Sequence, residues 1–175
     1  VLATTRFELR GLDLAGAPLA GRERPHLQFA ALSGAATWRL VSGGWRLDAP
    51  RLRLASGAGE QALDGLLLAG GRQYALQVPE LELGPLLGVL ALSDRLPDAR
   101  RAWLLDAAPR ARLASLELAG RRDGPLRVQG RLDGVGFAAV GRAPGLEGLA
   151  GSFEGDGEGL HLALDPGTPL RLDWP

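Results

Sequence analysis

The chain has 175 residues and a net charge of zero, with 20 basic and 20 acidic side chains, and 46% of its residues are apolar. Balanced charge argues against a nucleic-acid partner, because neutralising phosphates requires surplus cations. No cysteine is present, which excludes disulfide frameworks, thiolate metal sites and cysteine nucleophiles. No stretch reaches the roughly 18 to 20 apolar residues of a membrane span, so we expect any membrane anchor to lie outside this piece of chain.

Strict alternation of apolar and polar residues runs through most of the sequence and predicts strands with one apolar face and one polar face. Glycine-rich gaps separate the alternating runs and are typical of antiparallel hairpins. The spacing from run to run indicates a mainly β fold of roughly eleven strands. The clearest runs are residues 6–10, 45–48, 51–54, 73–78, 80–83, 115–118, 126–129, 160–164 and 170–174.

One segment, residues 85–108, departs from this alternation. Its apolar residues recur at helical spacing, and Pro85 suits the first turn of a helix. Pro97 divides the segment, and Asp98 supplies an acidic first turn for a second helix. We therefore expect two short helices inserted in the sheet, with Trp103 fixing the second helix to it.

Charged residues on the polar faces favour cross-strand ion pairs more than chemistry. Arg51 and Arg53 are predicted to lie opposite Glu80 and Glu82. The two glutamates also share one face, as a glycosidase pair would, but no aromatic cluster lies nearby in sequence to bind a sugar. Solubility and strand register are the favoured roles.

Two glycine-rich segments imitate ligand loops. Residues 57–62 match a relaxed dinucleotide fingerprint, but another short apolar run follows where a helix is required. Residues 155–159, together with His161, resemble a calcium loop without the full set of ligands. A hairpin turn is favoured for each, and we expect no metal and no cofactor.

The apolar face of the sheet is the remaining candidate. Eleven short strands would present an apolar area on the order of 1000 Å², of which the two helices could cover about 300 Å². Soluble monomers seldom expose so large a patch. The face must therefore close on itself as a β-sandwich, meet another segment or hold a ligand, and composition does not decide among these.

The order of the elements resembles one known family. Residues 81–86 (Leu-Glu-Leu-Gly-Pro-Leu) enter the helical segment, Leu96-Pro97 divides it, and residues 143–153 (Ala-Pro-Gly-Leu-Glu-Gly-Leu-Ala-Gly-Ser-Phe) form a later turn and strand. This arrangement, over residues 45–165, is similar to the large AsmA-like proteins of the YhdP type from the bacterial envelope.

The resemblance implies an extended, twisted antiparallel sheet curled into an open groove. It also implies that residues 1–175 are one segment of a longer chain, with strands at 1–83, a helical insert at 84–109 and strands at 110–175. The protein would lie in the periplasm, with its inner-membrane anchor in the remainder of that chain. A closed β-sandwich scaffold or interaction module of the envelope is the alternative.

The function implied by the resemblance is a non-enzymatic conduit for phospholipid acyl chains between the inner and outer membranes. Such a conduit needs an aliphatic lining and no catalytic residue. The residues that could line it are Leu47, Leu52, Leu54, Leu66, Leu68, Leu76, Val78, Leu116, Leu118, Leu126, Val128, Phe153, Leu160, Leu162 and Leu164.

Overall fold

The structure is a computed structural model that describes residues 1–57 and 59–175. In these residues 64% strand and two short helices confirm the mainly β prediction. The strands are β1 (Leu2–Ala15), β2 (His26–Val41), β3 (Gly44–Ser56), β4 (Gly59–Gly71), β5 (Gln73–Glu82), β6 (Arg110–Arg121), β7 (Leu126–Phe137), β8 (Gly145–Asp156), β9 (Leu160–Leu164) and β10 (Arg171–Asp173). The helices α1 (Leu83–Leu92) and α2 (Asp98–Ala107) connect β5 to β6.

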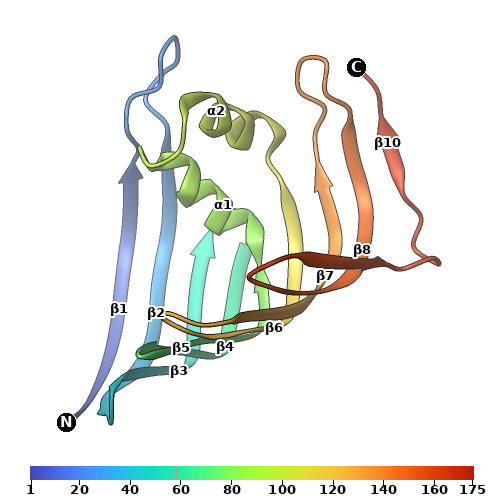
Figure 1. Ribbon diagram of the computed structural model, residues 1–175. Coiled ribbons are helices and arrows are strands. Elements are labelled where there is room, and N and C mark those ends of the chain that lie inside the picture. Colours follow the sequence, from blue (N-terminus) through green and yellow to red (C-terminus); the bar gives the residue numbers. More distant parts are fainter. Residues whose placement is uncertain (58) are drawn as a thin grey trace.

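The described strands form a single antiparallel sheet. From β1 to β8 each strand pairs with its neighbour in sequence, as the short glycine-rich turns predict. Both β9 and β10 pair with β8, β9 along residues 151–155 and β10 along residues 145–147. Figure 1 shows the chain crossing the sheet from β1 at one edge to β10 at the other.

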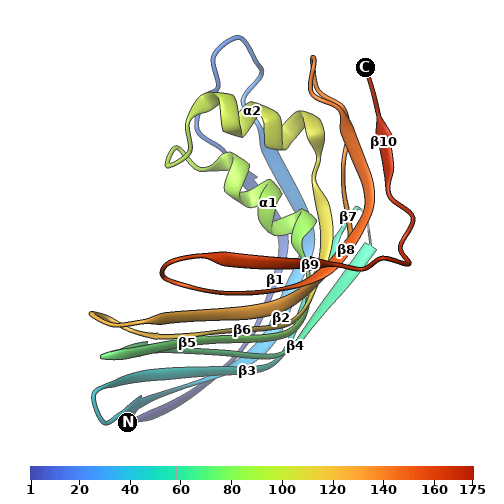
Figure 2. The same ribbon diagram turned by 45° about the vertical axis from the view of Figure 1, so that its right-hand side comes forward.

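Most strands bend part-way along their length, which curls the sheet into a trough (Figures 1 and 2). Backbone irregularities lie at the bend. Gly65 in β4 has φ +76° and Ser115 in β6 has φ +51°, and the β6–β7 register shifts next to Ser115. Pro79 in β5 lies against Gly65, with its Cγ 3.1 Å from the position that a Cβ on Gly65 would take. Such bulges bend and twist the strands that carry them.

The extra residue in β3 keeps the leucines on one face across the bend. Leu47 pairs with Trp38, and Leu52 pairs with Gly34. Trp38 and Gly34 are four residues apart on β2, whereas Leu47 and Leu52 are five residues apart on β3, yet both leucines lie on the same face. The register shift around Pro50 causes this difference of one residue. The apolar face is therefore continuous through the bend.

Both helices lie on the concave side of the trough (Figure 2). The Cδ1 atom of Leu27 in β2 is 3.1 Å from the Cβ position of Gly88 in α1. On α2, the ring of Trp103 contacts Phe137 edge to face, with centroids 5.6 Å apart. Neither helix, over the described residues, is long and apolar enough to cross a membrane. The helices and adjoining strand segments supply most of the buried apolar residues: Phe29, Ala91, Leu92, Ala107, Ala111 and Leu113.

Several strands are longer than the sequence predicts. Residues 45–48 and 51–54 belong to the same strand, β3, and the two predicted strands at 73–83 merge into β5. Pro50 lies at a bulge, and Pro79 lies beyond the end of the β4–β5 ladder, whose pairs involve residues 75–77 of β5. Neither proline therefore interrupts its strand.

The described residues exclude one alternative that the sequence left open and contradict one expected set of ion pairs. The described residues form one layer of sheet, so the closed β-sandwich is not present. Arg51 pairs with Asp64 at 3.8 Å rather than with Glu80, because the neighbours of β3 are β2 and β4. Arg53 likewise lies 3.9 Å from Glu60.

Candidate functional site: an apolar trough floor

A row of side chains crosses the concave face at right angles to the strands. Directly paired residues of antiparallel strands lie on the same face, so the row can be followed from pair to pair. At about 4.8 Å between strands, its nine members span about 38 Å. None of them is charged. From β1 to β9 they are Ala3, Trp38, Leu47, Leu68, Leu76, Leu118, Val128, Gly155 and Leu160.

Neighbouring rows extend this surface in both directions along the strands. On the side of the bend lie the pairs Ala49–Leu66, Val78–Leu116 and Phe153–Leu162. Toward the hairpin tips lie the pairs Trp45–Gly70, Tyr74–Gly120 and Gly120–Leu126. We refer to these three rows together as the floor.

The structure places every predicted lining residue on this face. Twelve of the fifteen lie in the floor itself. The other three lie beyond the bend: Leu52 pairs with Gly34, Leu54 with Leu32, and Leu164 with Gly151. Whether these residues bind a ligand remains a prediction, but the continuous surface that the prediction requires is present.

Most of the floor is accessible to solvent. Ala49 and Val78 are buried, whereas Leu160 and Leu162 at the β9 end are 66% and 50% exposed. The leucines in between are half-buried, because they cover one another and no second layer of the described chain covers them. An open apolar surface of this extent is the kind of patch that binds a ligand or a partner.

Aromatic side chains lie close to glycines on the concave face. A Cβ on Gly70 would lie 2.6 Å from the Trp45 ring, and one on Gly120 would lie 2.5 Å from the Tyr74 hydroxyl. The ring of Phe153 covers Gly130 in the same way, at 2.7 Å. Each ring shields a backbone that has no side chain of its own. These positions keep the floor smooth and apolar where a leucine is absent.

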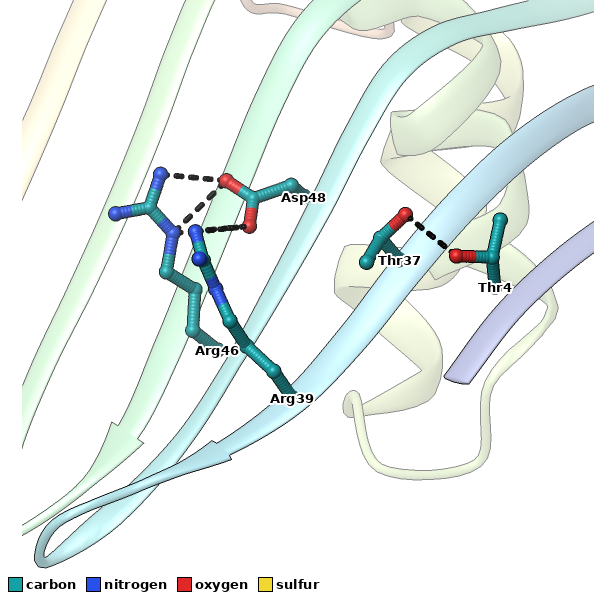
Figure 3. A network of polar contacts seen from close by, with 5 residues as sticks. All are labelled: Thr4, Thr37, Arg39, Arg46 and Asp48. Atoms are coloured by element: carbon teal, nitrogen blue, oxygen red, sulfur yellow. Dashed lines mark hydrogen bonds and ion pairs between the residues drawn. The ribbon is translucent and has the colours of Figure 1, made fainter. Parts of the chain in front are cut away.

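The opposite, convex face carries charged side chains, several of which form ion pairs across neighbouring strands. Arg39 and Arg46 are directly opposed on β2 and β3, and Asp48 accepts hydrogen bonds from both, at 3.0 Å from Arg39 Nη2 and 2.8 Å from Arg46 Nε (Figure 3). The hydrogen bond from Arg46 is the main reason that the pKa of Asp48 lies below its ordinary value. Beside this group, the Thr4 and Thr37 hydroxyls are 3.2 Å apart. The two faces of the sheet thus differ sharply in chemistry.

The residue that secures the helices to the sheet was not predicted. Trp103 is 37% exposed and only partly covers Phe137, so it is not the buried anchor that the sequence suggested. Arg101, two residues earlier, is 2% exposed and donates hydrogen bonds to the main-chain oxygens of Ala91, Ala17 and Pro18. No sequence signal marks this residue. Tyr74, in contrast, lies two residues before Leu76 in an alternating run, so its place in the floor could have been predicted.

The alternative sites have structural roles. Glu80 and Glu82 both lie near Arg112, with nitrogen to oxygen distances of 3.5 and 3.2 Å. Asp156 accepts the amide hydrogens of Glu158 and Gly159 within the β8–β9 turn, which lowers its pKa. These interactions are those of ion-paired strands and a hairpin turn.

The dinucleotide-like segment at residues 57–62 leads into β4, so the helix that such a site needs is absent from the residues described there. Ala58 of that segment lies outside the described residues.

The chain was compared with known families, curated sequences and solved structures. The model of the family described as YhdP protein matches residues 7–174. No curated protein matches the chain, and no solved structure matches it.

Proposed function

The chain belongs to the YhdP family, and we propose that its floor holds phospholipid acyl chains as they pass between the inner and outer membranes. The family places the chain among the AsmA-like proteins of the bacterial envelope. It is not known as a family of enzymes. In this proposal the chain acts in the periplasm, and the rest of a longer protein supplies the membrane anchor.

The observation that carries the proposal is the uncovered floor. Each methylene exposed to water costs about 0.8 kcal/mol, so an acyl chain in the periplasm needs an apolar surface along its whole path. The row from Ala3 to Leu160 supplies about 38 Å of such surface. One leaflet of a bilayer is about 15 Å of hydrocarbon, half of the roughly 30 Å core. The row is therefore long enough for an extended acyl chain.

The lining also suits a conduit better than a tight binding site. Aliphatic contacts are not directional, so a chain can slide along leucines without breaking specific bonds. The ion pairs of Glu80 and Glu82 with Arg112 also favour a non-enzymatic role.

Native mass spectrometry of the purified chain tests the proposal. Leu66→Arg and Leu118→Arg place a charge on the floor, and we expect them to abolish copurified phospholipid. Leu67→Arg is the matched control, because Leu67 pairs with Asp48 and Gln77 and so belongs to the convex face. Circular dichroism should show all three variants folded. Absence of lipid from the unsubstituted chain, or equal loss in the Leu67 variant, would contradict the proposal.

A further inference from the structure

A cavity of about 720 Å³ opens at the tips of neighbouring hairpins, at the edge of the floor. Its lining includes Trp45 of the floor, Arg72 of the β4–β5 turn, Arg121 at the end of β6, and Arg122 and Asp123 of the β6–β7 turn. Arg72 and Arg122 have the same parity along the chain as the floor residues Tyr74 and Gly120, whereas Arg121 pairs with Gln73 on the opposite face. Two arginines on the side of the floor therefore line one space beside an apolar surface, and we refer to Arg72 and Arg122 as the rim arginines.

Main-chain hydrogen bonds tie these hairpin tips together. The Arg122 amide donates to the Arg72 carbonyl at 3.2 Å, and the Arg72 amide donates to the Gly43 carbonyl at 3.2 Å. Because the last pair of β5 and β6 is Gln73 with Arg121, Arg72 and Arg122 are the next opposed positions, just beyond the ends of these two strands. The fold thus brings cations together that are fifty residues apart in the sequence.

Such a cluster is unfavourable without an anion. Directly opposed like charges on neighbouring strands destabilise a sheet. On the convex face the opposed pair Arg39 and Arg46 shares Asp48. The rim arginines, within residues 1–57 and 59–175, have no carboxylate at hydrogen-bond or ion-pair distance. An anionic ligand would supply the missing compensation.

We propose that the rim arginines bind the phosphate group of a phospholipid whose acyl chains lie on the floor. This inference rests on the proposed function and adds the headgroup contact to it. Guanidinium groups bind phosphate oxygens through paired, charge-assisted hydrogen bonds. Trp45 lines the cavity and also belongs to the floor, so a phosphate at the rim leaves its acyl chains directed along apolar surface.

The positive rim has a limited extent. The next hairpin tip, between β8 and β9, carries Asp156 and Glu158, which would repel a phosphate. The headgroup site is therefore assigned to the β4–β5 and β6–β7 tips and not to the whole edge of the trough.

The test compares two short-chain lipids with the same acyl chains: phosphatidylglycerol, which has a phosphate, and diacylglycerol, which has none. Binding to the purified chain is followed by calorimetry. For the double variant Arg72→Gln, Arg122→Gln we expect about tenfold weaker binding of phosphatidylglycerol and unchanged binding of diacylglycerol. The variant Arg72→Lys, Arg122→Lys should keep most of the affinity, since it keeps the charge.

Arg142→Gln is the matched control, because Arg142 is an exposed arginine of the β7–β8 loop and lies away from these tips. It should bind both lipids as the unsubstituted chain does. The unsubstituted chain itself gives a second measurement that needs no variant: added salt should weaken the binding of phosphatidylglycerol and leave diacylglycerol unaffected.

Three results would overturn the inference. Equal binding of both lipids at all salt concentrations, with no effect of the double variant, would remove the headgroup contact and leave the floor proposal intact. Binding of neither lipid would overturn the floor proposal as well. Inorganic phosphate bound as tightly as phosphatidylglycerol would assign the cavity to free phosphate instead of a lipid.

Discussion

Replacing Arg101 should separate the helices from the sheet. Its Nε atom donates to the Ala91 carbonyl at 3.0 Å, its Nη1 atom to the Pro18 carbonyl at 3.0 Å, and its Nη2 atom to the Ala17 carbonyl at 2.6 Å. Asp98, at 3.2 Å, is the nearby counter-ion. The guanidinium thus joins the β1–β2 loop to the end of α1 and the start of α2.

The magnitude follows from these contacts. The variant Arg101→Ala removes three hydrogen bonds from a charged donor and leaves main-chain oxygens without their partner in a buried region. A hydrogen bond from a charged donor contributes about 1.5–3 kcal/mol, and three such bonds are lost together, so we expect the free energy of unfolding to fall by about 3–5 kcal/mol. Arg101→Lys keeps the charge, but its compact ammonium does not reproduce the planar fan of donors. The free energy of unfolding of this variant should therefore fall by a smaller amount, about 1–3 kcal/mol.

Urea denaturation measures the free energy of unfolding, and hydrogen exchange locates the effect. The Ala17 amide donates to the Leu92 carbonyl at 2.9 Å, so its exchange should accelerate when the helices detach. Arg100→Ala is the matched control: Arg100 is exposed, and its loss should cost less than about 0.5 kcal/mol. A loss below about 1 kcal/mol for Arg101→Ala, with Ala17 still protected, would refute this reasoning.

Three further variants test other parts of the structure. Gly130→Ala should lower the free energy of unfolding by about 1–3 kcal/mol, because its Cβ would lie 2.7 Å from the Phe153 ring, and Phe153→Leu should relieve part of that loss in the double variant. Trp103→Ala should cost less than the roughly 3–5 kcal/mol of a fully buried tryptophan, and a cost in that full range in urea denaturation would contradict the exposed position seen here. In the folded chain, the hydrogen bond from Arg22 lowers the pKa of Asp106 below its ordinary value of 3.8. The ion pair therefore stabilises the fold above the ordinary pKa, and this contribution is lost as the pH falls through the lowered pKa of the folded chain. Unfolding curves of the chain and of Asp106→Asn should consequently converge in strong acid, and a constant difference from neutral to acidic pH would count against the ion pair.

Much of the floor could be predicted from the sequence because a strand has a strict period of two. The alternation of Leu126 and Val128 assigns both residues to one face whatever their neighbours are. The bend was harder to predict. The alternating runs were predicted as separate strands on either side of Pro50 and Pro79, but each proline lies where no ladder hydrogen bond is required, and the strands continue past them. Local propensity was outweighed by the pairing of the longer strands.

Contacts between distant segments could not be predicted. Arg101 binds main-chain oxygens 83 and 84 residues away, and a carbonyl has no residue-specific signature in a sequence. The rim cluster has the same origin, because Arg72 and Arg122 oppose each other only through the β5–β6 register, and the helical insert separates those two strands in sequence. The pattern along the chain predicts which residues share a face of the sheet, whereas the register between strands decides which residues lie together in a site.

Photocrosslinking from a lipid acyl chain tests the central claim most directly. A phospholipid with a diazirine in its acyl chain is bound to the purified chain and irradiated, and the adducts are mapped by tandem mass spectrometry. The floor predicts adducts at Leu68, Leu76 and Leu118, and few at Leu67 and Gln77, their neighbours on the convex face. Bound lipid with adducts spread equally over both faces would contradict the account.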